Sequence, residues 1–274
     1  RAAAGPPRME PAAFTPAANG VGTLPKGFKG GIFDGRYSYF IPNFNGNSEV
    51  MRYDTTAPFT AAASWATFDP NPPSGGDYVG GAFDGRYVYF APYRNGSLSI
   101  GEVLRYDTQS PFTSQASWST FDPSANDVGT SPKGYWGAFF DGRYIYFSPE
   151  HQTGSIQEHG EVLRYDTTLP FNQAASWLTY DAGAHGVGTD PDGYKGIASD
   201  GTYLYFVPYW NGTASHGEVL RYDRRGAFDV ASSWATYTPA ANGVGNIAKG
   251  FEGAVFDGRY LYFVPSYAGF GPNA

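Results

Sequence analysis

The chain has no cysteine, and its 274 residues include only two methionines and four histidines. The absence of cysteine excludes disulfide bonds, zinc–thiolate centres and a thiol nucleophile. No apolar run approaches the length that crosses a bilayer, so we expect no membrane span. Basic residues are also few: 18 lysines and arginines face 25 aspartates and glutamates, which gives a net charge of −7. An acidic chain of this kind argues against nucleic acid as a partner.

Sustained helical periodicity with capping residues is missing as well. Aromatic and turn-forming residues are abundant instead: 22 tyrosines, 21 phenylalanines and 6 tryptophans accompany 37 glycines and 21 prolines. Aromatic runs punctuated by Gly, Pro, Asn and Asp are typical of many short strands joined by tight turns. The composition therefore predicts an all-β protein.

One motif recurs through the whole chain. Asp-Gly-Arg-Tyr-x-Tyr-Phe occurs four times, and a fifth copy has Thr202 in place of arginine; the copies span 34–40, 84–90, 141–147, 200–206 and 257–263. A period of about 50 residues with four strand-like segments per unit is typical of a β-propeller blade. We therefore predict a single domain over 1–274, a five-bladed β-propeller of four-stranded antiparallel blades.

The repeats divide the chain into blades at roughly 17–69, 70–122, 123–181, 182–238 and 239–274, the last completed by 8–16. The N-terminal segment 10–16 (EPAAFTP) resembles the fourth-strand end at 234–239 (WATYTP), and Ala-Ala-Asn-Gly-Val-Gly follows both. We therefore expect the N-terminal strand to close the ring as the outer strand of the fifth blade. That blade lacks a segment resembling a third strand, so either residues 1–10 fill its place or the sequence is truncated.

Two residue types recur at fixed places for packing reasons. Blades crowd near the axis of a propeller, so the first strand needs a small residue, and we assign this role to Gly30, Gly80, Gly137, Gly196 and Gly253. The start of the fourth strand carries a large ring that we expect to pack between blades, in Trp65, Trp118, Trp177 and Trp234.

The unit resembles the Kelch branch of the β-propeller superfamily. In Kelch repeats an aromatic strand is followed by a loop, by a strand ending in Tyr-Asp and by a tryptophan; here those places hold Tyr144–Phe147, Tyr165-Asp166 and Trp177. The glycine pair of Kelch repeats is replaced by Ser148-Pro149 and its equivalents. Hemopexin-like repeats are also similar, but they close with four blades. The resemblance implies a fold and selects no chemistry, because Kelch-like propellers include oxidases, epimerases, lectins and interaction modules.

The loops between second and third strands differ among the units, and we expect them on one face together with the loops between blades. The longest, in the third unit, and its counterpart in the fourth carry Glu150, His151, Glu158, His159 and His216. Three interpretations compete: a metal site, acid–base catalysis with Arg94 steering an anionic substrate, and a solvated polar loop. The spacing matches no tight metal motif and no cofactor loop is recognisable, so we predict neither a metal nor a cofactor.

A second set of differing residues follows the first aromatic residue of each first strand. Strand alternation turns this position away from its aromatic neighbour, and we expect it to face the central channel near its mouth. The channel is then either merely water-filled or lined as a ligand site by Lys29, Trp136, Lys195 and Glu252.

Aromatic residues beyond the second-strand proline suggest a ligand class. Sugar rings stack on aromatic faces and their hydroxyls need fixed polar partners, which are offered by Tyr93 with Arg94 and Tyr209 with Trp210. We predict a lectin-like, extracellular or cell-surface protein that binds a glycan or similar small polar ligand. Two alternatives are a saccharide-active lyase or hydrolase with a His/Glu site, and a structural or protein-interaction module of a surface assembly.

Overall fold

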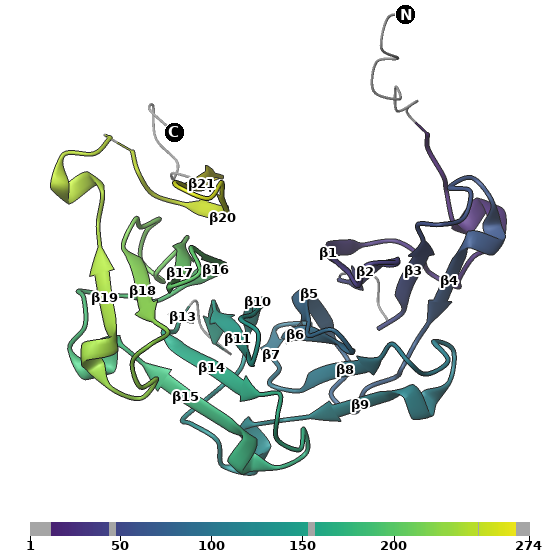
Figure 1. The fold of residues 1–274 in the computed structure, drawn as a ribbon, viewed down its shortest axis with the longest axis horizontal. Helices are drawn as coiled ribbons and strands as arrows, with labels where there is room; N and C mark the ends of the chain where they lie inside the picture. Colours follow the sequence, from purple (N-terminus) through teal and green to yellow (C-terminus); the bar gives the residue numbers. More distant parts are fainter. Residues whose placement is uncertain (1–11, 44–47, 153–156, 246, 267–274) are drawn as a thin grey trace, which may run out of the picture.

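The computed structural model describes residues 12–43, 48–152, 157–245 and 247–266. These residues form an all-β, propeller-like fold in which successive sheets stand side by side around an arc (Figure 1). Among them, helical structure is confined to three-residue 3₁₀ turns: η1 (Ala17–Asn19), η2 (Ala62–Ser64), η3 (Gln115–Ser117), η4 (Ser124–Asn126), η5 (Ala174–Ser176), η6 (Gly183–His185), η7 (Ala231–Ser233) and η8 (Ala240–Asn242). No helix in the described part is long and apolar enough to cross a bilayer.

Each of the first four sheets is an antiparallel meander of four main strands. Sheet one contains β1 (Phe28–Phe33), β2 (Tyr37–Pro42), β3 (Val50–Asp54) and β4 (Trp65–Phe68). Sheet two contains β5 (Asp77–Phe83), β6 (Tyr87–Asn95), β8 (Val103–Asp107) and β9 (Trp118–Phe121), and the short β7 (Leu98–Ser99) pairs with β6. In Figure 1 the first strand of each sheet faces the centre of the arc and the fourth lies outside.

The third and fourth sheets repeat this order, and the fifth is shorter. Sheet three contains β10 (Tyr135–Phe140), β11 (Tyr144–Pro149), β14 (Glu161–Asp166) and β15 (Trp177–Asp181). The small pair β12 (His151–Gln152) and β13 (Gln157–Glu158) rises from its loop. Sheet four contains β16 (Tyr194–Ser199), β17 (Tyr203–Pro208), β18 (Val219–Asp223) and β19 (Trp234–Tyr237), and sheet five contains β20 (Phe251–Phe256) and β21 (Leu261–Pro265).

The repeats therefore predict the all-β class and the four-stranded antiparallel unit correctly. The fifth sheet differs, because only two strands of it lie in the described residues. Figure 1 shows β20 and β21 standing apart from β1 and β2 by more than the spacing of neighbouring sheets. Of the segment expected to close the ring, residues 8–11 lie outside the described residues and 12–16 form no strand. The closed ring is thus not seen in this part of the chain.

The glycine column lets the inner strands approach one another as expected. A Cβ on Gly80 would lie 2.6 Å from both the Cα of Gly137 and the carbonyl oxygen of Trp136. Because both are backbone atoms, they could not move aside to avoid the clash. Gly137 in turn faces the Cα of Gly196, at 3.2 Å from its own ideal Cβ. Gly253, in the fifth sheet, has no described heavy atom within 4 Å of its ideal Cβ. The close contact therefore runs from sheet to sheet and stops where the arc opens.

Aromatic rings fill the space between successive sheets. The last aromatic residue of one sheet stacks on the tryptophan of the next, as in Phe121 on Trp177 at 5.4 Å between ring centroids. Phe14 stacks on Trp65 in the same way at 5.1 Å, so it occupies the place that a preceding blade would fill. The predicted inter-blade packing of the tryptophans is confirmed, and buried aromatic area of this kind is the main stabilising contribution.

The Asp-Gly turn on the opposite face is held by its aspartate. One carboxylate oxygen of Asp34 accepts the backbone N–H groups of Arg36 and Tyr37, and the other accepts the Tyr39 hydroxyl. All five units repeat this set of hydrogen bonds. Because every unit uses these groups identically, this face serves the fold, and the differing residues of the other face are the ones to examine for function.

Candidate functional site

A buried glutamate fixes the loop that enters each of the first four sheets. In the third sheet, Glu161 accepts the backbone N–H groups of Thr130 and Ser131 with its two carboxylate oxygens, at 2.7 and 2.8 Å. A Cβ on Gly129 would lie 2.3 Å from the same carboxylate, so only glycine allows this loop to approach. The loop precedes β10, and anchoring it fixes where the inner strand begins.

The differing residues of four inner strands meet at the centre of the arc. The ammonium groups of Lys29 from β1 and Lys195 from β16 each lie 3.9 Å from the ring centroid of Trp136 in β10. Lys195 also forms an ion pair of 3.1 Å with Glu252 from β20. These four residues, which the sequence places at one position of the repeat, are brought together; we call them the channel cluster.

Lys195 is the most enclosed member of the channel cluster. It is only 5% exposed, and its ammonium group also lies 3.4 Å from the ring centroid of Tyr209. Two aromatic faces and one carboxylate therefore replace its hydration. Lys29 is partly exposed, and burial followed by repulsion from Lys195 lowers its pKa. Among the described residues Lys29 forms no ion pair, so its charge is available to an anion.

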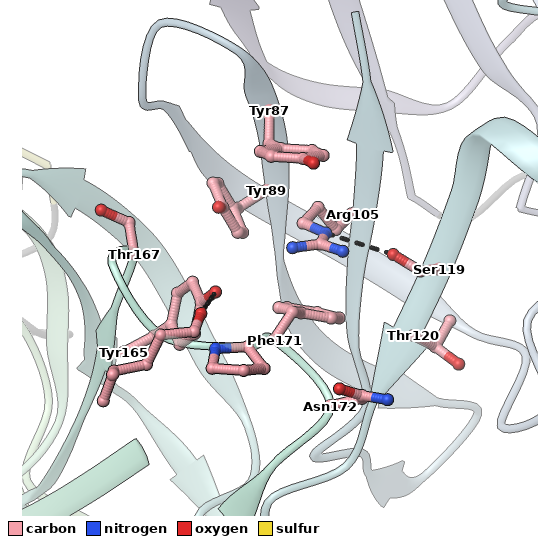
Figure 2. A pocket seen from close by; sticks show the side chains of 11 residues that line it. Tyr87, Tyr89, Arg105, Ser119, Thr120, Tyr165, Thr167, Phe171 and Asn172 are labelled. Carbon is pink, nitrogen blue, oxygen red and sulfur yellow. Dashed lines mark hydrogen bonds between the residues drawn. The ribbon is translucent and has the colours of Figure 1, made fainter. Parts of the chain in front are cut away.

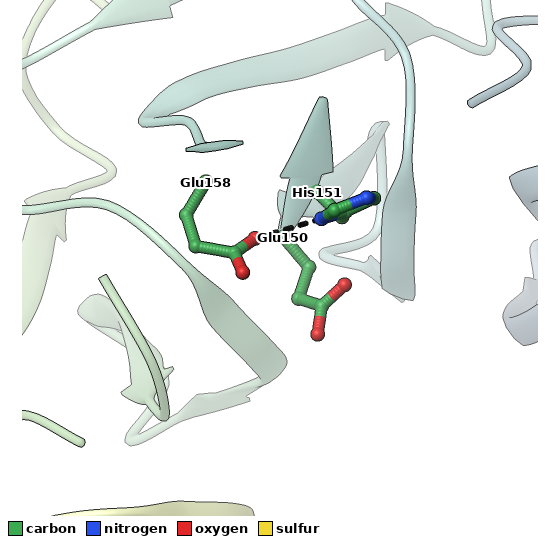
Figure 3. A group of neighbouring side chains, drawn as sticks. All are labelled: Glu150, His151 and Glu158. Carbon is green, nitrogen blue, oxygen red and sulfur yellow. Dashed lines mark ion pairs between the residues drawn. The ribbon is translucent and has the colours of Figure 1, made fainter. Parts of the chain in front are cut away.

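A group of ionisable side chains from the third-sheet loop lies next to the channel cluster. Glu150, His151 and Glu158 each place one nitrogen or carboxylate oxygen within 4.8 Å of the others (Figure 3). Nδ1 of His151 lies 3.5 Å from Oε2 of Glu158. Tyr93 donates a hydrogen bond to Glu150 and packs edge-on against Trp136, which links this group to the channel cluster.

Burial governs the ionisation of this group. Desolvation, reinforced by the charge of Glu158, raises the pKa of Glu150 to about 7. The neighbouring carboxylate of Glu158 raises the pKa of His151. A carboxyl group with a pKa near 7 can exchange protons at neutral pH, and an imidazole with two carboxylates is also a possible ligand set for a divalent ion.

The other two candidate histidines lie elsewhere. His159 and His216 occupy equivalent places in the third and fourth sheets, each edge-on to a buried tyrosine, Tyr135 or Tyr194. Ile100 occupies this place in the second sheet, where it is also buried. Burial lowers the pKa of His159 to about 4 and lowers that of His216. Their positions match those of a packing residue, and neither belongs to the group of Glu150, His151 and Glu158.

The loops place different residues at equivalent cross-strand positions. The three described pairs are Arg94 opposite Ser99, His151 opposite Glu158, and Trp210 opposite Ser215. Arg94, Tyr209 and Trp210 are partly exposed, whereas Tyr93 is buried. Comparison of the repeats identified these positions, but it did not pair Tyr93 with Glu150 or Tyr209 with Lys195. Both contacts cross between sheets, and no sequence spacing encodes them.

A cavity of about 460 Å³ lies away from these residues, between sheets two and three (Figure 2). Arg105 spans it, with its guanidinium 4.2 Å from the ring centroid of Tyr87 and 4.1 Å from that of Phe171. The neighbouring sheets repeat this arrangement with Arg52 and Arg164. Because an arginine between two rings recurs at the three interfaces among sheets one to four, it belongs to the packing of the sheets, and we therefore exclude this cavity from the candidate site.

Comparison with known proteins gives little guidance. No protein-family model matches the chain, and no curated protein is significantly similar to it. Among solved structures, the chain is similar to hydrazine synthase from Kuenenia stuttgartiensis, with 14% identity and a TM-score of 0.45. The match covers 76% of this chain and 53% of that one, so the chain spans about half the length of that protein. A likeness this distant bears on neither function nor family.

Proposed function

We propose that the chain binds a saccharide, or a similarly polar small ligand, at the channel cluster and the loops around it. The observation that carries the proposal is the gathering of Lys29, Trp136, Lys195 and Glu252 from one repeat position. The fold does not require these residue types there, since the second sheet has a buried valine, Val79. Differing side chains at the one place where all inner strands converge are what a single asymmetric ligand site needs.

The chemistry of the cluster favours a ligand with an acidic group. Lys29 offers an ammonium group without a carboxylate partner among the described residues, whereas Lys195 is already paired with Glu252. Trp136, Tyr209 and Trp210 are partly exposed and offer ring faces or edges to sugar C–H groups. We therefore expect a saccharide that carries a carboxylate, with its charge beside Lys29.

A glycan array followed by calorimetric titration tests the proposal. We expect the protein to bind a carboxylate-bearing saccharide, and Lys29→Met and Trp136→Ala to weaken binding about tenfold or more, as the loss of one charge or stacking contact implies. Lys26→Met is the matched control, because Lys26 is exposed in the loop before β1. A folded protein that binds no saccharide on the array, or variants that bind as tightly as the parent, would contradict the proposal.

Catalysis on a saccharide is a second candidate, and one observation favours it. Glu150 has a pKa of about 7 and lies beside Glu158 and the Tyr93 hydroxyl, a set suited to general acid–base chemistry. The sequence also suggested His159 and His216 for this site, but these side chains pack edge-on against Tyr135 and Tyr194. Release of new reducing ends or of unsaturated products from acidic polysaccharides, abolished by Glu150→Gln, is the result expected of an enzyme.

A protein-interaction role is supported by the open end of the arc. Sheet five exposes apolar side chains, among them Val255 at 61% and Tyr262 at 53%. A cavity of about 390 Å³ lies between β19 and β21, at the interface where the guanidinium of Arg221 lies over the ring of Tyr203. Its counterpart Arg105 lies between two rings. This end therefore offers an apolar surface to further strands.

The number of blades and their Kelch-like type are also part of this proposal. Five Kelch-like blades are supported by the repeats and by Phe14, which stacks on Trp65 as Phe121 stacks on Trp177. An extracellular or cell-surface location follows from the proposed glycan ligand alone. Secretion of the native protein by its source, measured by fractionation, tests the location independently of binding.

A further inference from the structure

Glu150, His151 and Glu158 bring two buried carboxylate oxygens close to one imidazole. Oε2 of Glu150 accepts no hydrogen bond in the described structure, and Oε2 of Glu158 has only the 3.5 Å contact with Nδ1 of His151. Glu150 as a whole is only 6% exposed. Burying the Glu150 oxygen without a partner, beside a second carboxylate that has only a long contact, is costly and points to a ligand that supplies positive charge.

The distances fit a metal ion better than a hydrogen bond. Nδ1 of His151 and Oε2 of Glu158 are 3.5 Å apart, which is longer than an ordinary N–H···O bond. Two ligands that each lie about 2.1 Å from one ion at a tetrahedral angle are about 3.4 Å apart. All three candidate ligand atoms lie within 4.8 Å of one another, so Glu150 needs only a small side-chain rotation to join them (Figure 3).

The fold does not demand this residue set. The positions of His151 and Glu158 are taken by Arg94 and Ser99 in the second sheet and by Trp210 and Ser215 in the fourth. The position of Glu150 is taken by tyrosine in both sheets, Tyr93 and Tyr209. Only the third sheet combines an imidazole with two carboxylates at these positions.

The ammonium group of Lys195 has other partners. It is directed to Trp136, Tyr209 and Glu252, and the described structure contains no ion pair between Lys195 and Glu150. Tyr93 donates a hydrogen bond to Glu150, an outer contact of the kind that orients carboxylate ligands of metals.

We propose that Glu150, His151 and Glu158 bind one divalent transition-metal ion of the zinc class. Imidazole with carboxylate suits zinc and its neighbours, whereas calcium and magnesium select oxygen ligands alone. Three protein ligands leave one tetrahedral position for water or for an oxygen of a bound molecule. The site stands independently of saccharide binding, although its position beside Trp136 places it at the edge of the proposed ligand site.

Calorimetric titration of the chelator-treated full chain with Zn²⁺ alone tests the site. We expect one equivalent to bind, and His151→Gln and Glu150→Gln each to weaken binding about 100-fold or more. His185→Gln is the matched control, because His185 is exposed at the end of η6 and stacks on Tyr180. The control is expected to bind as the parent does.

Three outcomes would overturn the assignment: no Zn²⁺ binding by the parent protein, unchanged binding in both site variants, or binding of Ca²⁺ in preference to Zn²⁺. Circular dichroism of each variant establishes that it is folded, and Glu158→Gln replaces any variant that is not. A Zn²⁺-dependent rise of the thermal midpoint in the parent and the control, absent from the site variants, is expected as a second readout. Because the titration contains no saccharide, its result is separate from that of the glycan array.

Discussion

One buried and one half-buried histidine, His159 and His216, give the protein a specific sensitivity to acid. Burial lowers the pKa of His216, and it lowers that of His159 to about 4. An unfolded histidine takes up a proton near pH 6.5, whereas the native side chains do so only at lower pH. Each group therefore contributes stability at neutral pH that is lost progressively as the pH falls below about 6.5.

His216→Ile isolates one of these contributions, because Ile100 already fills the equivalent place in the second sheet. Nδ1 of His216 is buried without a partner, so we expect the variant to match or exceed the parent by about 1 kcal/mol at pH 8. Its advantage should widen at pH 5. Urea unfolding at both values measures this, with the exposed His185→Ile as control. An advantage that is the same at both pH values would contradict the assignment.

Among the strands and loops, the repeat predicts where each strand lies, but it does not predict which side chains of neighbouring sheets meet at the candidate site. The Asp-Gly turn and the alternating tyrosines fixed the second strand of each unit, because local hydrogen bonds and side-chain alternation determine it. The comparison of repeats also found the positions of Lys29, Trp136 and Lys195. It could not foresee that Tyr93 meets Glu150, or that His216 packs like an isoleucine, because those contacts depend on how neighbouring sheets pack.

The contribution of the Glu161 carboxylate to stability can be tested. The Glu161 carboxylate accepts two backbone N–H groups of the loop before β10. In a glutamine at this position, the side-chain NH₂ group would face one of these N–H donors. We expect Glu161→Gln to lower the free energy of unfolding by about 1–3 kcal/mol. Chemical denaturation measures the loss, with Asp229→Asn, whose side chain is exposed in a turn, as a control that loses much less. A loss no larger than that of the control would show that the anchor is dispensable.

At the scale of the molecule, the open arc is the feature that differs most from the expected ring. A Cβ on Gly80 meets the backbone of the next sheet, whereas one on Gly253 meets no described atom within 4 Å. Because the arc is open at sheet five, we expect Gly80→Ala to lower the free energy of unfolding by about 2 kcal/mol or more. We expect Gly253→Ala to change the free energy of unfolding by less than about 0.5 kcal/mol. Thermal unfolding compares the two. Equal losses would instead show that sheet five closes against sheet one.

At the centre of the arc, the differing residues of the inner strands form the proposed ligand site. Four of the six tryptophan indoles lie in the blade packing, where each donates a hydrogen bond to a backbone carbonyl, while Trp136 lies in the channel cluster and Trp210 in the adjoining loop. Indole N–H signals in ¹H–¹⁵N spectra therefore separate the site from the core, with Trp136→Phe assigning the decisive signal.

The most direct measurement is a titration of the ¹⁵N-labelled protein with a uronic-acid oligosaccharide, followed through these indole signals. We expect the Trp136 indole signal to shift until the site is saturated, and the signals of the four core indoles to remain unchanged. A ligand that binds without moving the Trp136 signal, or that shifts the core indoles instead, would contradict the proposed site.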